Sequence, residues 1–168
     1  MAENKETSKS RRIDIDHYFL DIADVVACRS TCLRHKIGAV AVVDRQPIAT
    51  GYSGAPSGLR DCLELGCIRD ELKIPSGERI ETCRAVHAEI NVICQAAVHG
   101  TSIKGATIYC THTPCISCAK ALINCHIKRF VARETYDDDA YKDLFNEAGI
   151  EFVQLGRDWP KTLYQKEG

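Results

Sequence analysis

The sequence of 168 residues lacks any long hydrophobic run and any marked excess of charge of one sign. A membrane-spanning helix needs roughly 18 consecutive apolar residues, and no stretch of the chain approaches that length, so we expect no membrane span. Residues 1–12 contain no hydrophobic segment typical of a secretory signal, so we expect a cytoplasmic protein. The 22 basic and 23 acidic residues give a net charge of −1, which argues against a long nucleic acid as partner.

Internal repeats and low-complexity segments are also missing, while 45% of the residues are hydrophobic and 27% are charged. This composition supplies enough apolar material for a core and excludes a disordered chain. Residues 1–12 carry four basic and two acidic side chains and almost nothing apolar, which indicates a flexible, solvated tail. We therefore predict a single domain over residues 13–168.

Hydrophobic periodicity along the chain predicts alternating helices and strands, with Asp14 as the N-cap of the first helix. Two apolar runs around Asp44 predict a hairpin, and the later strands and helices alternate through short links. This order predicts a three-layer α/β/α sandwich with a five-stranded mixed sheet, in which the hairpin adds one antiparallel pair. The expected helices are 15–29, 85–99, 115–125 and 139–148, and the expected strands are 38–43, 48–52, 106–111, 128–133 and 150–155.

The ten cysteines are the most unusual feature of the composition. In a reducing compartment, clustered cysteines indicate a metal site more often than a disulfide framework. Residues 53–83, rich in Gly, Pro and Ser, contain only one short helical stretch and are too long for a plain connector. A segment of this kind is functional or is held by something other than a hydrophobic core.

Two short motifs carry the chemistry of the sequence. His87 and Glu89 belong to an H-x-E triplet, and Cys115 and Cys118 belong to a P-C-x-x-C motif that begins the next predicted helix. The two cysteines are separated by three positions, so both thiols face the same way in the first helical turn. Together with His87 they make a three-ligand zinc site whose fourth position is open to water, the pattern of catalytic zinc. Glu89 is then the candidate proton carrier.

H-x-E followed by P-C-x-x-C is the signature of the zinc nucleobase deaminases. The sequence resembles the cytidine deaminase superfamily and, within it, the deoxycytidylate (dCMP) deaminase branch. The flanking segments that carry the resemblance to that branch are RSTC (29–32), GAV (38–40), GYSGAP (51–56), HAEIN (87–91) and ETYD (134–137).

The resemblance implies zinc-dependent hydrolytic deamination of dCMP to dUMP and ammonia, a reaction that feeds thymidylate synthesis. It implies that the metal ionises a water and that Glu89 carries protons to ring N3 and to the departing amine. It also implies a homo-oligomer, often a hexamer in this branch, and regulation by dCTP and dTTP.

The resemblance further implies that Ser53, Ala88 and Tyr136 contact the substrate, with an ordinary strand-end tyrosine as the alternative for Tyr136. His112, just before the P-C-x-x-C motif, is expected to line the pocket through its backbone rather than its imidazole. Relatives usually carry Asn at the position of Ser53, so this departure leaves the nucleotide preference and the regulation open. The basic residues before the first strand either meet the 5′-phosphate or form a solvated helix end; they are Arg29, Arg34 and Lys36.

The remaining eight cysteines divide into two groups. Some dCMP deaminases hold a second, structural zinc, and the matching positions here are Cys32, Cys62, Cys67 and Cys83. Four free thiols at these positions are the equal alternative. The other four occupy apolar positions of predicted helices and strands and are expected to pack in the core; they are Cys28, Cys94, Cys110 and Cys125.

Two other classes of function remain open from the sequence. The same fold and chemistry serve other substrates, namely dCTP, cytidine, guanine, a riboflavin precursor or tRNA adenosine. A non-catalytic zinc-binding accessory protein would explain the cysteines but not Glu89, because a structural site needs no carboxylate two residues from a ligand.

Overall fold

The structure, a computed structural model, describes residues 13–136 and 139–156. The predicted tail over residues 1–12, and residues 157–168 of the predicted domain, lie outside the described residues. The elements, in chain order, are α1 (Ile15–Ala27), β1 (Gly38–Val43), β2 (Gln46–Tyr52), α2 (Cys62–Leu65), α3 (Ile68–Glu71), the 3-10 turn η1 (Ile80–Thr82), α4 (Ala88–Val98), β3 (Thr107–His112), α5 (Ile116–Asn124), β4 (Arg129–Glu134), α6 (Tyr141–Glu147) and β5 (Glu151–Gln154).

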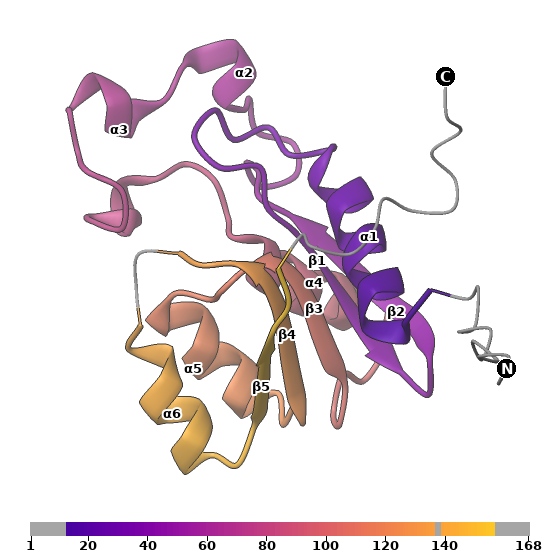
Figure 1. Cartoon of the computed structure of the whole chain (residues 1–168). Helices are drawn as coiled ribbons and strands as arrows, with labels where there is room; N and C mark the ends of the chain where they lie inside the picture. The colour runs from indigo at the N-terminus through magenta and orange to yellow at the C-terminus, as the bar shows by residue number, and fades with distance from the viewer. Residues whose placement is uncertain (1–12, 137–138, 157–168) are drawn as a thin grey trace, which may run out of the picture.

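The five strands form one mixed sheet in the order β2-β1-β3-β4-β5 (Figure 1). Strands β3, β4 and β5 are parallel, whereas β1 is antiparallel to both of its neighbours, β2 and β3. The five-stranded mixed sheet confirms the prediction, but the expectation of a single antiparallel pair is wrong. The hairpin places β2 at the sheet edge and β1 inside, so that β1 pairs on both sides.

Helices cover both faces of this sheet, which gives the predicted three layers (Figure 1). Along β1, Val40 and Val42 point to the face covered by α1, whereas Ala39 and Ala41 point to the core shared with α4, α5 and α6. This alternation is the period of two expected for a strand that is buried on both faces. The sheet therefore supplies a rigid frame whose strand ends position the loops.

Two glycines allow helices to lie very close to the strands. A Cβ atom at Gly38 would lie 2.2 Å from the carbonyl oxygen of Ala23 in α1, and one at Gly51 would lie 2.3 Å from that of Ala88 in α4. Any side chain at these positions would push the helix away. Gly51 thus fixes the start of α4, which carries His87 and Glu89.

The first helix begins as predicted, because the Asp14 side chain accepts hydrogen bonds from the amides of Asp16 and His17. The predicted packing role is wrong for Cys28 and Cys94, which are exposed. Cys28 follows the last turn of α1, and Cys94 lies opposite the buried side of α4. Cys110 is buried as predicted, and Cys125 is half-buried. No helix among the described residues is long and apolar enough to cross a membrane.

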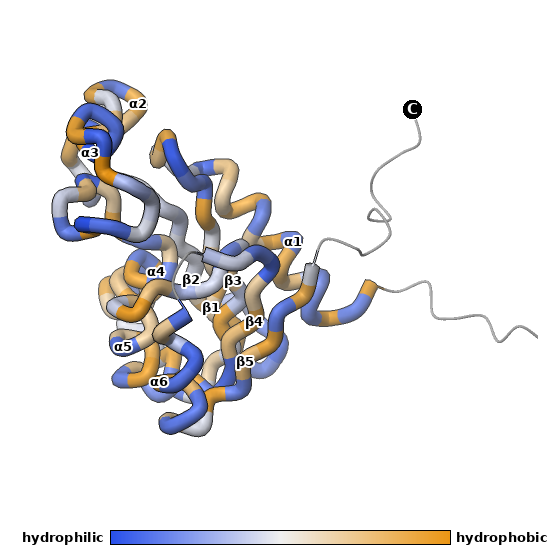
Figure 2. The backbone as a smooth tube through the Cα atoms, turned by 60° about the vertical axis from the view of Figure 1, so that its left-hand side comes forward, coloured by the Kyte–Doolittle hydropathy of each residue, from blue (hydrophilic) through white to orange (hydrophobic). Residues whose placement is uncertain are grey.

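The segment between β2 and α4, which we call the insertion (residues 53–86), stands apart from the strands (Figure 2). The insertion exposes large apolar side chains in and around its two short helices, namely Leu59, Leu63, Ile68 and Leu72. Within α2 and α3 the buried side chains are Cys62 and Arg69. The insertion thus contributes little to the hydrophobic core of the domain.

Candidate active site

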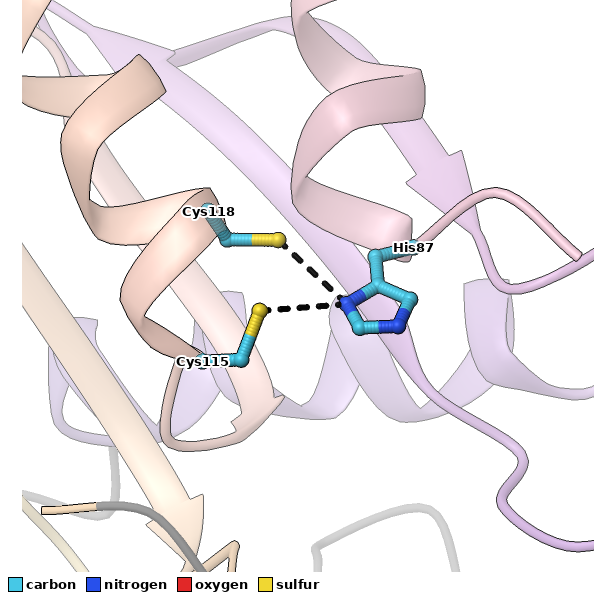
Figure 3. Close-up of side chains that lie close together, drawn as sticks. All are labelled: His87, Cys115 and Cys118. Atoms are coloured by element: carbon cyan, nitrogen blue, oxygen red, sulfur yellow. Dashed lines mark hydrogen bonds between the residues drawn. The ribbon is translucent and has the colours of Figure 1, made fainter. Parts of the chain in front are cut away.

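Two helix starts bring the predicted zinc ligands together. His87 is the N-cap of α4, and Cys115 is the N-cap of α5, which follows β3 directly. His87 Nδ1 lies 3.5 Å from Cys115 Sγ and 3.4 Å from Cys118 Sγ, and the three side chains point toward one another (Figure 3). The convergence follows from the fold, because both helices begin at the same end of the sheet.

The chemistry of this donor set fits zinc. In the described part of the chain, His87, Cys115 and Cys118 are the one group of three or more potential ligands whose ligand atoms all lie within 4.8 Å of one another. One imidazole and two thiolates would balance the +2 charge of the ion. Three protein ligands also leave the fourth tetrahedral position open, as catalytic zinc sites require.

Glu89 lies in the first turn of α4 and is 4% exposed. Burial raises the pKa of Glu89 to about 7, against the opposing effect of the nearby His87. A carboxylate with such a pKa can both accept and release a proton near neutral pH. The position and environment of Glu89 therefore suit a general acid and base beside the three ligands.

The three ligands share a proton network. A hydrogen bond from Cys118, together with contact with His87, lowers the pKa of Cys115 to about 4, and the same bond raises the pKa of Cys118. The hydrogen bond with Cys115 also raises the pKa of His87. The starts of α4 and α5 also favour negative charge on the thiols at this point.

A cavity opens beside these residues and is lined by two of the four predicted substrate contacts, Ser53 and Tyr136. Tyr136 is 9% exposed and packs against Cys115 and Cys118. Ala88 is fully buried, and the His112 ring pairs with Glu134 at 3.4 Å; neither is among the described residues lining the cavity. Their role in substrate binding stays a prediction.

The hydroxyl of Ser53 is engaged by the preceding loop. It donates to the carbonyl of His35 at 2.9 Å and accepts from the Ile37 amide at 3.1 Å, and Ser30 Oγ lies 2.7 Å away. Ser53 is 5% exposed, so its hydroxyl is enclosed by these contacts although the residue lines the cavity. The side chain ties the end of β2 to the loop over residues 30–37.

That loop carries a cavity residue that the sequence analysis missed. The His35 ring packs edge-to-face on Tyr136 at a centroid distance of 5.8 Å, and its Nε2 lies 3.2 Å from Ser76 Oγ. No motif marked His35, because its role depends on the insertion folding back over the loop. Of the three basic residues considered for phosphate, Arg34 lines the cavity, whereas Arg29 and Lys36 are exposed.

The four cysteines considered for a second zinc reach the same cavity. Cys32 comes from the loop after α1, and Cys62, Cys67 and Cys83 come from the insertion; all four line the cavity wall. Burial, followed by the proximity of the other three thiols, raises the pKa of Cys62. The four cysteines share this cavity, but they are not among the described groups whose ligand atoms all lie within 4.8 Å of one another.

Comparisons with known proteins agree with this site. Residues 13–134 match the family described as the cytidine and deoxycytidylate deaminase zinc-binding region. ComE operon protein 2 of Bacillus subtilis is 37% identical over 88% of this chain and 74% of its own length. Deoxycytidylate deaminase of Schizosaccharomyces pombe is 34% identical over 83% of this chain, which spans 43% of that protein.

Among solved structures, the dCMP deaminase of cyanophage S-TIM5, in complex with dCMP and dUMP, superposes with a TM-score of 0.72. It is 26% identical to this chain, and the match covers 87% of this chain and all of the phage protein.

Proposed function

Because the chain belongs to the cytidine and deoxycytidylate deaminase family, we propose that it catalyses the hydrolytic deamination of dCMP to dUMP and ammonia. The reaction would supply dUMP for thymidylate synthesis. The observation that carries the proposal is the buried Glu89 beside a three-ligand His-Cys-Cys site. A purely structural zinc site uses four protein ligands and no adjacent acid.

His87, Cys115 and Cys118 would hold a catalytic zinc ion, and zinc bound there would lower the pKa of a water toward neutrality. Glu89 accepts the proton of that water and delivers it to ring N3. Glu89 then takes the second proton of that water, from the hydroxyl now bonded to C4, and delivers it to the amine as the C4–N bond breaks and ammonia leaves, so one carboxylate serves as base and acid in turn. Its burial keeps bulk water from competing for these protons.

The aromatic side chains of the cavity orient the base. Tyr136 packs against both ligand cysteines, and its backbone amide donates to Thr113 Oγ1 at 2.7 Å, which fixes the start of the loop after β4. His35 braces the Tyr136 ring from the side. A flat pyrimidine between such rings and the ligand set would present C4 to the attacking water.

We assign recognition of the 5′-phosphate to Arg34. Its Nε pairs with Asp70 at 3.1 Å and its Nη2 donates to the Ile74 carbonyl at 2.9 Å, whereas its buried Nη1 has no partner. A cavity-lining guanidinium with a free N–H suits a phosphate oxygen.

Further assignments concern a second metal site, the oligomeric state, the effectors and the compartment. Four cysteines at one cavity wall support a second, structural zinc held by Cys32, Cys62, Cys67 and Cys83. A homo-oligomer, in this branch often a hexamer, and dCTP or dTTP as effectors follow from the resemblance alone. The free thiols of the described cysteines suit a reducing compartment, the cytoplasm.

The test is ammonia release from a panel of dCMP, dCTP, deoxycytidine, CMP and guanine. We expect dCMP to have the highest kcat/KM, and Arg34→Gln to raise KM for dCMP without changing the slow turnover of deoxycytidine. The control is Arg29→Gln, which removes an exposed charge near the same loop. Preferential turnover of guanine or deoxycytidine would contradict the proposed substrate.

A further inference from the structure

The start of α4 lacks the side-chain cap that usually holds a helix terminus. Its N-cap is His87, whose ring turns toward Cys115 and Cys118 and makes no capping hydrogen bond. Ser, Thr, Asp and Asn are the usual N-cap residues, because their side chains accept hydrogen bonds from the first amides of the helix. The chain before His87 is the insertion, which contributes little to the core. Other contacts are therefore needed to hold this ligand in place.

The start of α5, which carries the other two ligands, is held by the sheet itself. Cys115 is the N-cap of α5 and also makes no capping hydrogen bond, but only Thr113 and Pro114 separate it from the end of β3. The amide of Thr113 donates to the carbonyl of Glu134, at the end of β4, at 2.9 Å. The position of α5 thus follows from a short link, whereas α4 follows a long segment.

Asn91, in α4, ties this helix to the edge strand β2. Its Nδ2 donates to the carbonyl of Tyr52 at 2.7 Å and lies 3.5 Å from the carbonyl oxygen of Val86. The amide of Ser53, which belongs to the same peptide unit as the Tyr52 carbonyl, points inward and donates to the Ile37 carbonyl at 2.9 Å. Because the N–H and C=O of a trans peptide point in opposite directions, the Tyr52 carbonyl points to the outer side of β2. The amide of Asn91 occupies the place that a further strand would take.

A two-residue bridge lies beside this contact. The amide of Gly54 donates to the carbonyl of Val86 at 3.2 Å, and the amide of Val86 donates to the carbonyl of Gly54 at 2.8 Å. Val86 directly precedes His87, and the carbonyl of His87 accepts from the backbone amide of Asn91 at 3.0 Å. One residue therefore contacts the end of β2, the residue before the ligand and the ligand's own backbone.

We propose that Asn91 is a positioning residue that holds the first turn of α4 on the end of β2 and thereby places His87 and Glu89 beside the two ligand cysteines. The proposal rests on the proposed function, because it concerns the zinc ligand and the proton carrier named there. It gives a role to the last residue of the HAEIN segment (87–91), which neither the ligand set nor the proton carrier explains. The role depends on the N–H donor, because an oxygen in its place would face two carbonyl oxygens.

Two other roles for Asn91 make different predictions. If the hydrogen bonds only stabilise the fold, the folded variants keep the zinc affinity and the kcat of the wild type. If Asn91 contacts the substrate, its loss raises KM for dCMP and leaves zinc affinity unchanged. Asn91 is not among the described residues that line the cavity, which argues against direct contact with the base. A positioning role instead changes zinc affinity and kcat together.

The experiment compares three substitutions in the full chain. Asn91→Ala removes the donor, Asn91→Asp replaces it with an oxygen, and Asn91→Gln keeps an amide donor on a longer side chain. The matched control is Gln95→Glu, which makes the same change from amide to carboxylate at an exposed position one turn further along α4. Far-UV circular dichroism checks the fold, and Asn91→Ala carries the test if Asn91→Asp folds poorly.

Zinc per chain is measured by elemental mass spectrometry against a graded series of a zinc chelator. Cys118→Ser, which lacks one ligand, defines the share of the metal that belongs to the three-ligand centre. Steady-state kinetics with dCMP in zinc-saturated solution then separate kcat from KM. The zinc measurement does not depend on any activity.

We expect Asn91→Asp to weaken zinc binding at the three-ligand centre about 10- to 100-fold, the range found for groups that orient metal ligands from outside the ligand set. Asn91→Ala should lose less, Asn91→Gln should recover part of that loss, and Gln95→Glu should match the wild type. The kcat for dCMP should fall in the same order, with little change in KM.

Wild-type zinc affinity and kcat in Asn91→Asp and Asn91→Ala would overturn the inference, as would a raised KM alone. An equal loss in Gln95→Glu would also overturn it, because added negative charge on α4 would then be the cause. If the zinc affinities follow the expected order but the wild type leaves dCMP unchanged, the positioning role stands and the proposed function fails.

Discussion

The His87–Cys115–Cys118 centre and the four cysteines of the insertion and the loop after α1 lie at the same cavity but are held in different ways. The first centre is built on two helix starts whose positions are fixed by a buried sheet, and its ligand atoms already lie within 4.8 Å of one another. The four cysteines are gathered from a loop and an insertion with little core of its own. The fold thus preorganises the three-ligand centre, whereas in our proposal the insertion depends on the zinc that its cysteines would bind.

The largest expected effect is that of removing one of the three ligands of the His87–Cys115–Cys118 centre. Cys118→Ser should abolish the catalytic zinc and reduce dCMP turnover to background, because two ligands cannot hold the ion against solvent. The fold should survive, since the sheet and not the metal positions α4 and α5. Zinc content and dCMP turnover measure the loss of the metal and of activity, and circular dichroism checks the fold. Cys94→Ser, on the exposed side of α4, should be unaffected, and equal losses in both variants would contradict the assignment.

The second expected effect distinguishes loss of proton transfer by Glu89 from loss of the metal. Glu89→Gln preserves shape and should keep both zinc ions, yet lower kcat for dCMP by about 10²–10⁴-fold, because the amide cannot transfer protons. The measurements are steady-state kinetics and zinc content, with the exposed Glu81→Gln as control. Loss of zinc along with activity would show that Glu89 acts through the ligands instead.

The third effect tests the insertion. Cys62→Ser should lose the second zinc and make the insertion sensitive to limited proteolysis, because little apolar burial remains to hold it. The catalytic zinc should remain, since its ligands lie on other elements. Zinc content and mass spectrometry of the fragments check this, beside Cys28→Ser at an exposed position. A protease-resistant insertion without its zinc would remove the contrast between the two regions.

The smallest expected effect concerns the ion pair between α1 and β4, far from both proposed metal sites. Arg129 donates to both carboxylate oxygens of Asp16 at 2.6 and 2.9 Å, which ties α1 to β4, and this pairing lowers the pKa of Asp16. Asp16→Asn should reduce the free energy of unfolding by about 1.5–3 kcal/mol at neutral pH, without changing either zinc. Denaturant unfolding measures the loss, and Glu151→Gln, at the exposed partner of Arg129, should cost about 0–1 kcal/mol.

The same pair gives a pH dependence of defined sign. Because the pKa of Asp16 is lower in the folded state, its contribution to stability is present above the ordinary carboxyl value of 3.8 and is lost as the pH falls through the folded value. The difference between wild type and Asp16→Asn should therefore shrink in strongly acidic solution. A difference that grows there would contradict the ion pair.

The sequence was sufficient to predict the frame and the grouping of the three candidate zinc ligands, because both depend largely on local patterns. The cap at Asp14, the strand–helix alternation and the spacing of Cys115 and Cys118 are each determined by a few adjacent residues. The inner position of β1 was missed, since strand order depends on which edge the hairpin takes.

Long-range contacts explain what else the sequence analysis missed. His35 meets Tyr136 across about 100 intervening residues, a contact that no local spacing encodes. The buried charge of Arg69 is equally invisible in the sequence, where it reads as one of many basic residues of an exposed segment. The exposed Cys94 shows the same limit, because an apolar residue type does not reveal which side of a helix faces the core.

The most direct test of the central claim is product analysis of zinc-loaded wild-type protein incubated with dCMP. The account predicts that each dCMP consumed yields one dUMP and one ammonia, and that removal of the catalytic zinc by a chelator stops the reaction until zinc is restored. Zinc-loaded protein that leaves dCMP unchanged, with Glu89 intact, would contradict the account.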